Sequence, residues 1–161
     1  MTSSILQHFN IVKTFHVFDS FKGGLSQFTN IDLDNTKQLD ISLEQFSEKF
    51  SSSYELLIQK LQVHKLTNVI LNKGWIPDVF KDYPDDNYSF VHLDVDLYEP
   101  TYTALDYFFV RLNKGGVIVY DDYSYSVFPG AKQAVDHYLK SIPGQFVFHP
   151  FSVGGCMIIK S

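Results

Sequence analysis

The sequence has a single cysteine, Cys156, and no run of apolar residues long enough to cross a membrane. One cysteine excludes an intrachain disulfide and a metal site built from several cysteines. The N-terminal segment MTSSILQHFNIVKTF lacks the charged start and the apolar core of a secretory signal. Together these absences predict a cytoplasmic protein that does not associate with membranes.

The sequence also lacks an excess of basic residues, internal repeats and low-complexity tracts. The chain has 13 lysines and arginines and 18 acidic residues, and its net charge of −5 argues against a nucleic-acid partner. The 161 residues suffice for one domain with a real core, which we expect to span 1–161. An aromatic share of 16% suits a dense core or an aromatic-lined cleft.

Strand-like and helix-like segments alternate along the chain. The expected strands are 14–18, 69–71, 88–94 and 117–123, the expected helices are 51–66, 99–116 and 129–141, and FVFHPF with CMIIK forms a closing hairpin. This order predicts an α/β domain whose sheet is mostly parallel, with an antiparallel hairpin at its C-terminal end. Residues 26–50 are polar, with turn formers around Asp32, and predict a long loop of the kind that is often functional.

Polar residues follow every one of the expected parallel strands. They are Asp19, then Gly74 and Trp75, then Asp94 and Asp96, then Asp121 and Asp122. In α/β sheets, ligands bind beyond the carboxyl ends of the strands. We therefore expect these side chains to share one rim of the sheet.

The acidic residues at the third and fourth strand ends resemble a hard-oxygen cage for Mg²⁺. A divalent ion would offset the repulsion among Asp94, Asp96 and Glu99 and could orient a substrate hydroxyl, with one carboxylate acting as general base. The alternative is that Asp96 or Glu99 only caps the helix that follows.

Other polar and aromatic residues have two interpretations each. Asp19 suits either ribose hydroxyls or a turn, and Trp75 suits either a stacked base or the core. The six histidines show no ligand spacing, and His92 is expected to pack in the core.

Two long blocks, FVHLDVDLYEPTYTAL and LNKGGVIVYDDYSYSVFPGAKQAVDHYL, closely resemble the macrocin O-methyltransferase family. VFDSFKG and NKGWIPDVF fit the same family in the same order, so the resemblance covers roughly residues 14–160. It implies a class I methyltransferase fold, which is Rossmann-like, with S-adenosylmethionine and Mg²⁺ as cofactors. The expected activity is methylation of a hydroxyl on a sugar or another small natural product.

The resemblance also implies a role for individual residues. Mg²⁺ would be held by Asp94, Asp121 and Asp122, and Asp96 would be the catalytic base. The residues expected to bind S-adenosylmethionine are Asp19, Ser20, Gly74, Trp75 and Asp94. The loop at 26–50 would help to cover the site.

The chain departs from the family at its N-terminal end. Family members carry a further strand and a glycine-containing loop upstream, whereas Met1 to Lys13 contains no glycine. We therefore expect an N-terminally truncated sheet with two edges that need a partner, which a homo-oligomer could supply. We expect weak binding of S-adenosylmethionine and little activity from these 161 residues, both restored by an upstream strand and glycine turn.

Three other functions are compatible with parts of the sequence. A phosphohydrolase of the haloacid dehalogenase type needs D-x-D-x-T, but Tyr98 stands where threonine belongs. A nucleotide-sugar transferase could use the same D-x-D for a metal and a diphosphate. An inactive methyltransferase remnant, acting only through association, is the non-enzymatic alternative.

Overall fold

The computed structural model describes residues 2–22, 25, 28–32, 53–81, 83, 86–125 and 129–161. Gly23, Gly24 and most of the expected loop at 26–50 lie outside the described residues. The elements in chain order are α1 (Thr2–His8), β1 (Phe15–Asp19), α4 (Tyr54–Val63), β2 (Val69–Lys73), the short 3-10 helix η1 (Asp78–Phe80), β3 (Tyr88–Leu93), α5 (Tyr98–Arg111), β4 (Leu112–Tyr120), α6 (Pro129–Ser141), β5 (Phe146–Pro150) and β6 (Cys156–Lys160).

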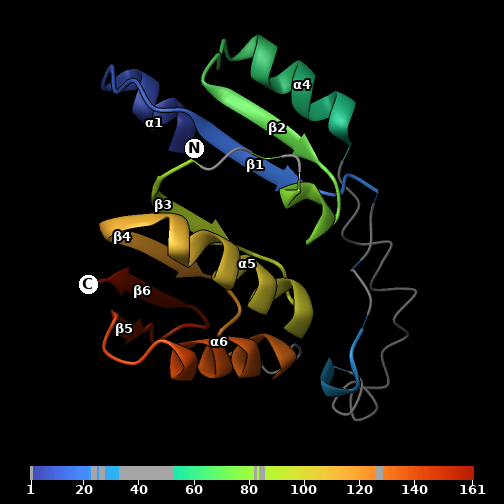
Figure 1. The fold of residues 1–161 in the computed structure, drawn as a ribbon. Coiled ribbons are helices and arrows are strands. Elements are labelled where there is room, and N and C mark those ends of the chain that lie inside the picture. The colour runs from blue at the N-terminus through green and yellow to red at the C-terminus, as the bar shows by residue number, and fades with distance from the viewer. Residues whose placement is uncertain are drawn as a thin grey trace.

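The C-terminal half forms a four-stranded sheet in the order β3-β4-β6-β5 (Figure 1). β3 and β4 run parallel, and β6 pairs antiparallel with β4 on one side and with β5 on the other. The predicted α/β class and the antiparallel C-terminal hairpin are both confirmed. Parallel pairing brings the ends of β3 and β4 to the same edge, with Leu93 opposite Tyr120.

β1 and β2 form a separate parallel pair, in register from Phe15 opposite Val69 to Asp19 opposite Lys73. The described strands therefore fall into two sheets. A cavity of about 350 Å³ lies between them, lined by residues 14–19 on one side and by 88 and 90–95 on the other.

The hydrophobic core lies between the four-stranded sheet and the two helices α5 and α6, which cover one face of it (Figure 1). Val91 and Leu93 point into this core, because successive side chains of a strand point to opposite faces. Phe90 and His92 lie on the other face and are exposed. The prediction that His92 packs in the core is therefore wrong, since its side chain is 48% exposed. Within the described ranges, every helix is too short or too polar to traverse a lipid bilayer.

The end of α5 also differs from the sequence prediction. The helix ends at Arg111 rather than near Gly115, and β4 begins directly at Leu112. Lys160 of β6 donates hydrogen bonds to the carbonyls of Phe109 and Val110, at 2.8 and 3.1 Å. The last carbonyls of a helix have no partner within the helix, and here the Lys160 side chain supplies hydrogen-bond donors for two of them.

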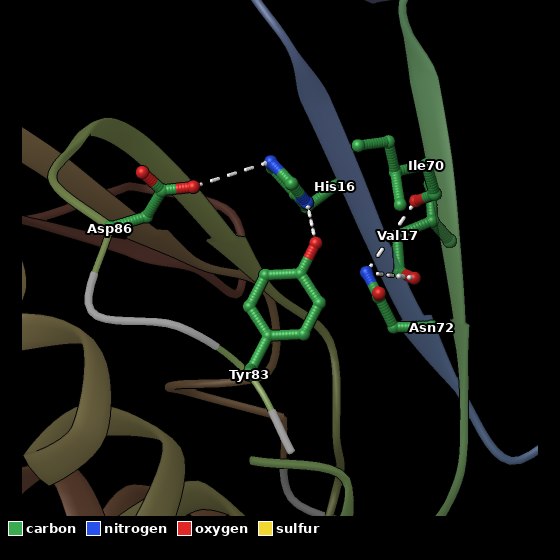
Figure 2. Close-up of polar contacts among 6 residues, drawn as sticks. All are labelled: His16, Val17, Ile70, Asn72, Tyr83 and Asp86. Carbon is green, nitrogen blue, oxygen red and sulfur yellow. Dashed lines mark hydrogen bonds and ion pairs between the residues drawn. The ribbon is translucent and has the colours of Figure 1, made fainter. Parts of the chain in front are cut away.

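A polar network connects β1 to the segment that precedes β3. Figure 2 shows His16 of β1 with Nδ1 bonded to the Tyr83 hydroxyl and with Nε2 3.9 Å from an Asp86 carboxylate oxygen. Asn72 of β2 donates to the Val17 carbonyl at 3.2 Å. Burial lowers the pKa of His16, and the nearby Asp86 partly offsets this. The network links the two-stranded layer to the rest of the molecule.

Candidate active site

The segment that joins β3 to α5 carries the first two acidic residues of the candidate site. β3 ends at Leu93, and α5 begins at Tyr98, so Asp94 to Leu97 must reverse the chain within four residues. The Leu97 N–H donates to the Val95 carbonyl at 2.6 Å, and Asp96 adopts a φ of 56°. This left-handed conformation is uncommon for a residue with a side chain, and aspartate tolerates it better than most.

Three aspartates converge at this edge of the sheet. Asp94, Asp96 and Asp122 each offer a carboxylate oxygen, and these oxygens lie within 4.8 Å of one another. Asp96 is buried, Asp122 is partly buried and Asp94 is exposed. Asp121 takes a different position, since it is exposed and one of its oxygens lies 3.8 Å from Nε2 of His92.

Burial and mutual repulsion raise the pKa of all three clustered carboxyls. The pKa of Asp96 is raised to about 7, chiefly by burial and then by the charges of Asp122 and Asp94. Burial also raises the pKa of Asp122, with repulsion from Asp94 adding to it. Although the Asp94 side chain is exposed overall, partial desolvation of its carboxyl group raises its pKa, and the charge of Asp121 adds to this. A bound cation would relieve this strain, because it favours the charged form of every carboxylate.

The donor set fits a hard divalent cation. All three groups are carboxylates, which Mg²⁺ prefers as protein ligands. In the part of the chain that the structure describes, the Oδ2 atom of Asp122 is buried and has no hydrogen-bond partner. A buried oxygen of this kind normally has a partner, and an absent ion is one reason for an orphan.

A cavity of about 250 Å³ opens beside the acidic cluster. Its polar lining comprises Asp19, Ser20, Gly74, Trp75, Asp94 and Asp96. These are the five residues that the family resemblance implies for cofactor binding, together with the implied base. The ends of β1 and β2 are joined here, since the Gly74 N–H donates to the Asp19 carbonyl at 3.0 Å.

The apolar lining of the same cavity was not predicted from the sequence. It comprises Phe18, Leu25, Ile76, Val95 and Pro100. Nothing in the local sequence marks these residues, because apolar side chains in a cleft and in a core look alike before the chain is folded. Trp75 is partly buried and lines the cavity, and its stacking on a base stays a prediction.

A comparison with protein families gives a match over nearly the whole chain. The family described as Macrocin-O-methyltransferase (TylF) matches residues 1–159. Two curated relatives match over shorter stretches. A demethyldecarbamoylnovobiocin O-methyltransferase of Streptomyces niveus is 35% identical over 40% of this chain and 24% of its own length. An 8-demethyl-8-(2,3-dimethoxy-alpha-L-rhamnosyl)-tetracenomycin-C 4'-O-methyltransferase of Streptomyces olivaceus is 39% identical over 32% of this chain and 20% of its own.

Solved structures share the fold at low sequence identity. The O-methyltransferase NovP superposes with a TM-score of 0.81 at 23% identity, over 99% of this chain and 65% of that one. A calicheamicin methyltransferase superposes with a TM-score of 0.72 at 17% identity, over 98% of this chain and 65% of its own. The fold is therefore that of these methyltransferases, and the chain spans just under two thirds of their length.

Proposed function

Because the chain belongs to the macrocin O-methyltransferase family, we propose that it serves the transfer of a methyl group from S-adenosylmethionine to a hydroxyl of a sugar or another small natural product. One observation carries the proposal. The acidic cluster of Asp94, Asp96 and Asp122 borders the same cavity as Asp19, Gly74 and Trp75. The residues proposed to act on the acceptor and those proposed to bind S-adenosylmethionine would thus line the same cavity.

The names of the relatives favour this substrate class. The name of the first curated relative describes O-methylation of demethyldecarbamoylnovobiocin, and the name of the second describes O-methylation of a rhamnosyl tetracenomycin. The acceptor proposed for this chain is accordingly a small hydroxyl compound, for instance a glycoside. The phosphohydrolase alternative gains no comparable support, because the matching folds are methyltransferases.

On the acceptor side, each aspartate has a proposed role. Asp94, Asp121 and Asp122 would hold Mg²⁺, with Asp94 and Asp122 already facing each other and Asp121 adjacent. A bound divalent ion supplies a positive charge that orients a hydroxyl and lowers its pKa. Asp96 would accept the hydroxyl proton, because its carboxylate lies beside those of Asp94 and Asp122 and lines the cavity.

On the donor side, the proposed contacts come from the ends of β1 and β2. Asp19 and Ser20 follow β1, and Gly74 and Trp75 follow β2. Asp19 would accept hydrogen bonds from ribose hydroxyls, and Trp75 would lie against the adenine. An added Cβ on Gly74 would lie 3.1 Å from the Cβ of Val79, so glycine lets this turn pack closely against η1.

The test compares two isosteric substitutions, Asp96→Asn and Asp94→Asn, in a methyl-transfer assay and in a calorimetric titration with Mg²⁺. If Asp96 is the base, Asp96→Asn lowers kcat by about 10²–10⁴-fold and leaves Mg²⁺ affinity nearly intact. Asp94→Asn should weaken Mg²⁺ binding itself. Equal losses of Mg²⁺ affinity in the two variants would contradict this division of roles.

A second titration, with S-adenosylmethionine in the presence and absence of Mg²⁺, tests the donor side. The weak affinity expected of these 161 residues stays a prediction, and low-micromolar binding with turnover would contradict it.

A cytoplasmic location and a homo-oligomeric state also stay predictions, which fractionation and light scattering can check.

A further inference from the structure

Among the described residues, two acidic side chains are fully buried: Asp96 at 9% exposure and Asp32 at 3%. Asp96 belongs to the candidate site, but Asp32 lies in the segment between β1 and α4 and has no role so far. A carboxylate is rarely buried unless its oxygens have donors. The donors of Asp32 therefore show what it does.

Both oxygens of Asp32 accept hydrogen bonds. Oδ1 accepts from the backbone N–H of Tyr98 at 3.0 Å, across 66 residues of sequence. Oδ2 accepts from the N–H and the hydroxyl of Thr29, at 2.8 and 2.6 Å. Tyr98 is the first residue of α5, and the residue before it, Leu97, has no side chain that can cap the helix. Asp32 thus supplies from a distant segment the cap that α5 lacks in its own sequence.

The start of α6 is shaped to receive this carboxylate. A Cβ added to Gly130, the second residue of α6, would lie 2.0 Å from Oδ1 of Asp32 and 3.2 Å from the Cβ of Tyr98. Only a residue without a side chain leaves room for the carboxylate at this point. Asp32 is therefore held between the first turns of α5 and α6.

This contact bears directly on Asp96. The φ of 56° at Asp96 is a conformation that persists only where the surrounding structure imposes it. On one side the chain is held by β3, which ends at Leu93. On the other side it is held by the first turn of α5, whose leading N–H is bound by Asp32.

The same segment forms one wall of the cavity. Leu25 lines the cavity together with Trp75 and Asp96, and both Leu25 and Phe28 pack against the hydrophobic core. Thr29 and Asp32 follow directly and fix this part of the chain on α5. We propose that Asp32 is a positioning residue that holds the Asp96 turn and the Leu25 wall of the cavity in place. Its consequence for methyl transfer rests on the proposed function, whereas its effect on the geometry does not.

The first test uses Trp75, the one tryptophan of the chain, as a reporter in the cavity wall. Asp32→Ala should increase the quenching of Trp75 fluorescence by acrylamide and shift its emission to longer wavelength. The matched control is Ser53→Ala, which removes a helix cap of the same kind, the 3.2 Å bond from the Leu56 N–H at the start of α4. Both variants should lower the melting temperature by about 2–4 °C, but only Asp32→Ala should alter the Trp75 signal.

A second test uses Gly130→Ala, whose new methyl group would displace the Asp32 carboxylate. Alone, this variant should reproduce the Trp75 changes of Asp32→Ala. In the double variant Asp32→Ala/Gly130→Ala, the methyl group no longer meets the Asp32 carboxylate, so the two losses of melting temperature should be clearly less than additive. Full additivity, or a Trp75 signal that is unchanged in Asp32→Ala, would overturn the proposal.

Methyl transfer provides the link to catalysis. Because a turn displaced by about 1 Å can cost up to about 10²-fold, Asp32→Ala should lower kcat well beyond the effect of Ser53→Ala, with little change in the KM of the acceptor. If neither wild type nor variants turn over but the Trp75 and melting results hold, the positioning role stands independently of the proposed function. If turnover is normal and Asp32→Ala matches Ser53→Ala in every readout, the positioning role fails alone.

Discussion

The two sheets of the molecule differ in how much they bury. The four-stranded sheet with α5 and α6 supplies nearly all buried hydrophobic residues, among them Ile118 and Ile158 at 0% exposure. By contrast, β1, β2 and α4 contribute no fully buried hydrophobic residue, and Ile70 on β2 is 46% exposed. The residues proposed for acceptor chemistry therefore follow strands of the packed sheet. Those proposed for the cofactor follow β1 and β2, which with α4 form a layer with little buried surface, called the thin layer below.

The difference extends to charge. At the packed end, burial raises the pKa of Asp96, so the folded state there favours the protonated form. In the thin layer, burial lowers the pKa of His16, so the folded state there favours the neutral form. The first region should weaken as the pH rises and the second as the pH falls. The following experiments test this contrast, beginning with the largest expected effect.

The same substitution placed in each sheet measures the difference in packing. Ile118→Ala, in β4, should lower the free energy of unfolding by about 2–5 kcal/mol, because it leaves a cavity in a closed core. Ile70→Ala, in β2, should cost less than about 1 kcal/mol, because the side chain is already half exposed. Denaturant unfolding of both variants gives the comparison. Similar losses in both would mean that the thin layer is packed more tightly than its exposure indicates.

Removing the charge of Asp96 should stabilise the metal-free protein at high pH. The pKa rises from an ordinary 3.8 to about 7 on folding, so wild type loses stability progressively between about pH 4 and pH 7. Asparagine cannot ionise and tolerates the left-handed turn, so Asp96→Asn should gain about 1–4 kcal/mol over wild type at pH 8, with little gain at pH 4.

Thermal unfolding in EDTA, with and without excess Mg²⁺, checks this expectation. Mg²⁺ should raise the melting temperatures of wild type and of Asp96→Asn by similar amounts, because the proposed ligands Asp94, Asp121 and Asp122 are present in both. Asp106→Asn, an exposed change on α5, controls for the loss of one negative charge. A stability gain in Asp96→Asn that is equal at pH 4 and pH 8 would exclude the raised pKa as its cause.

Acid should loosen the thin layer through His16. Since the pKa of His16 is lowered on folding, its stabilising contribution is present above about pH 6.5 and is lost as the pH falls below that value. Hydrogen exchange at β1 and β2 should therefore accelerate between pH 7 and pH 5, after correction for the intrinsic rate. His16→Phe should abolish this acceleration and Tyr83→Phe should retain it, because only the first removes the titrating group. The titratable neighbours are Asp86, Tyr83 and Tyr88.

The smallest effect is expected for a surface ion pair. Lys81 and Asp78, beside η1, lie 2.6 Å apart, with side chains 71% and 72% exposed. Asp78→Ala should change the free energy of unfolding by less than about 1 kcal/mol, since exposed ion pairs gain little in water. A larger loss would show that polar contacts, rather than burial, hold this side of the molecule.

Sequence patterns located most of the elements and the acidic groups. Period-2 alternation and helix spacing placed β3, α6 and the closing hairpin, because each depends on its own residues. The predicted strand ends put Asp94, Asp96 and Asp122 on one edge of the sheet, because the carboxyl ends of neighbouring parallel strands lie at the same edge. The same logic did not separate Asp121 from Asp122, and the metal roles of both stay predictions. The exposed position of His92 was missed because alternation alone does not tell which face is covered.

The sequence by itself determined what is local: the strand and helix periods, the carboxylates at the strand ends, and the family blocks around them. Only the tertiary structure decided what depends on distant partners. Lys160 donates a hydrogen bond to a carbonyl at the end of α5, where a local glycine was expected. Asp32 accepts a hydrogen bond from the first N–H of the same helix, 66 residues away. Neither contact leaves a local pattern, because a hydrogen bond across the fold depends on where two segments meet and not on the residues beside either one.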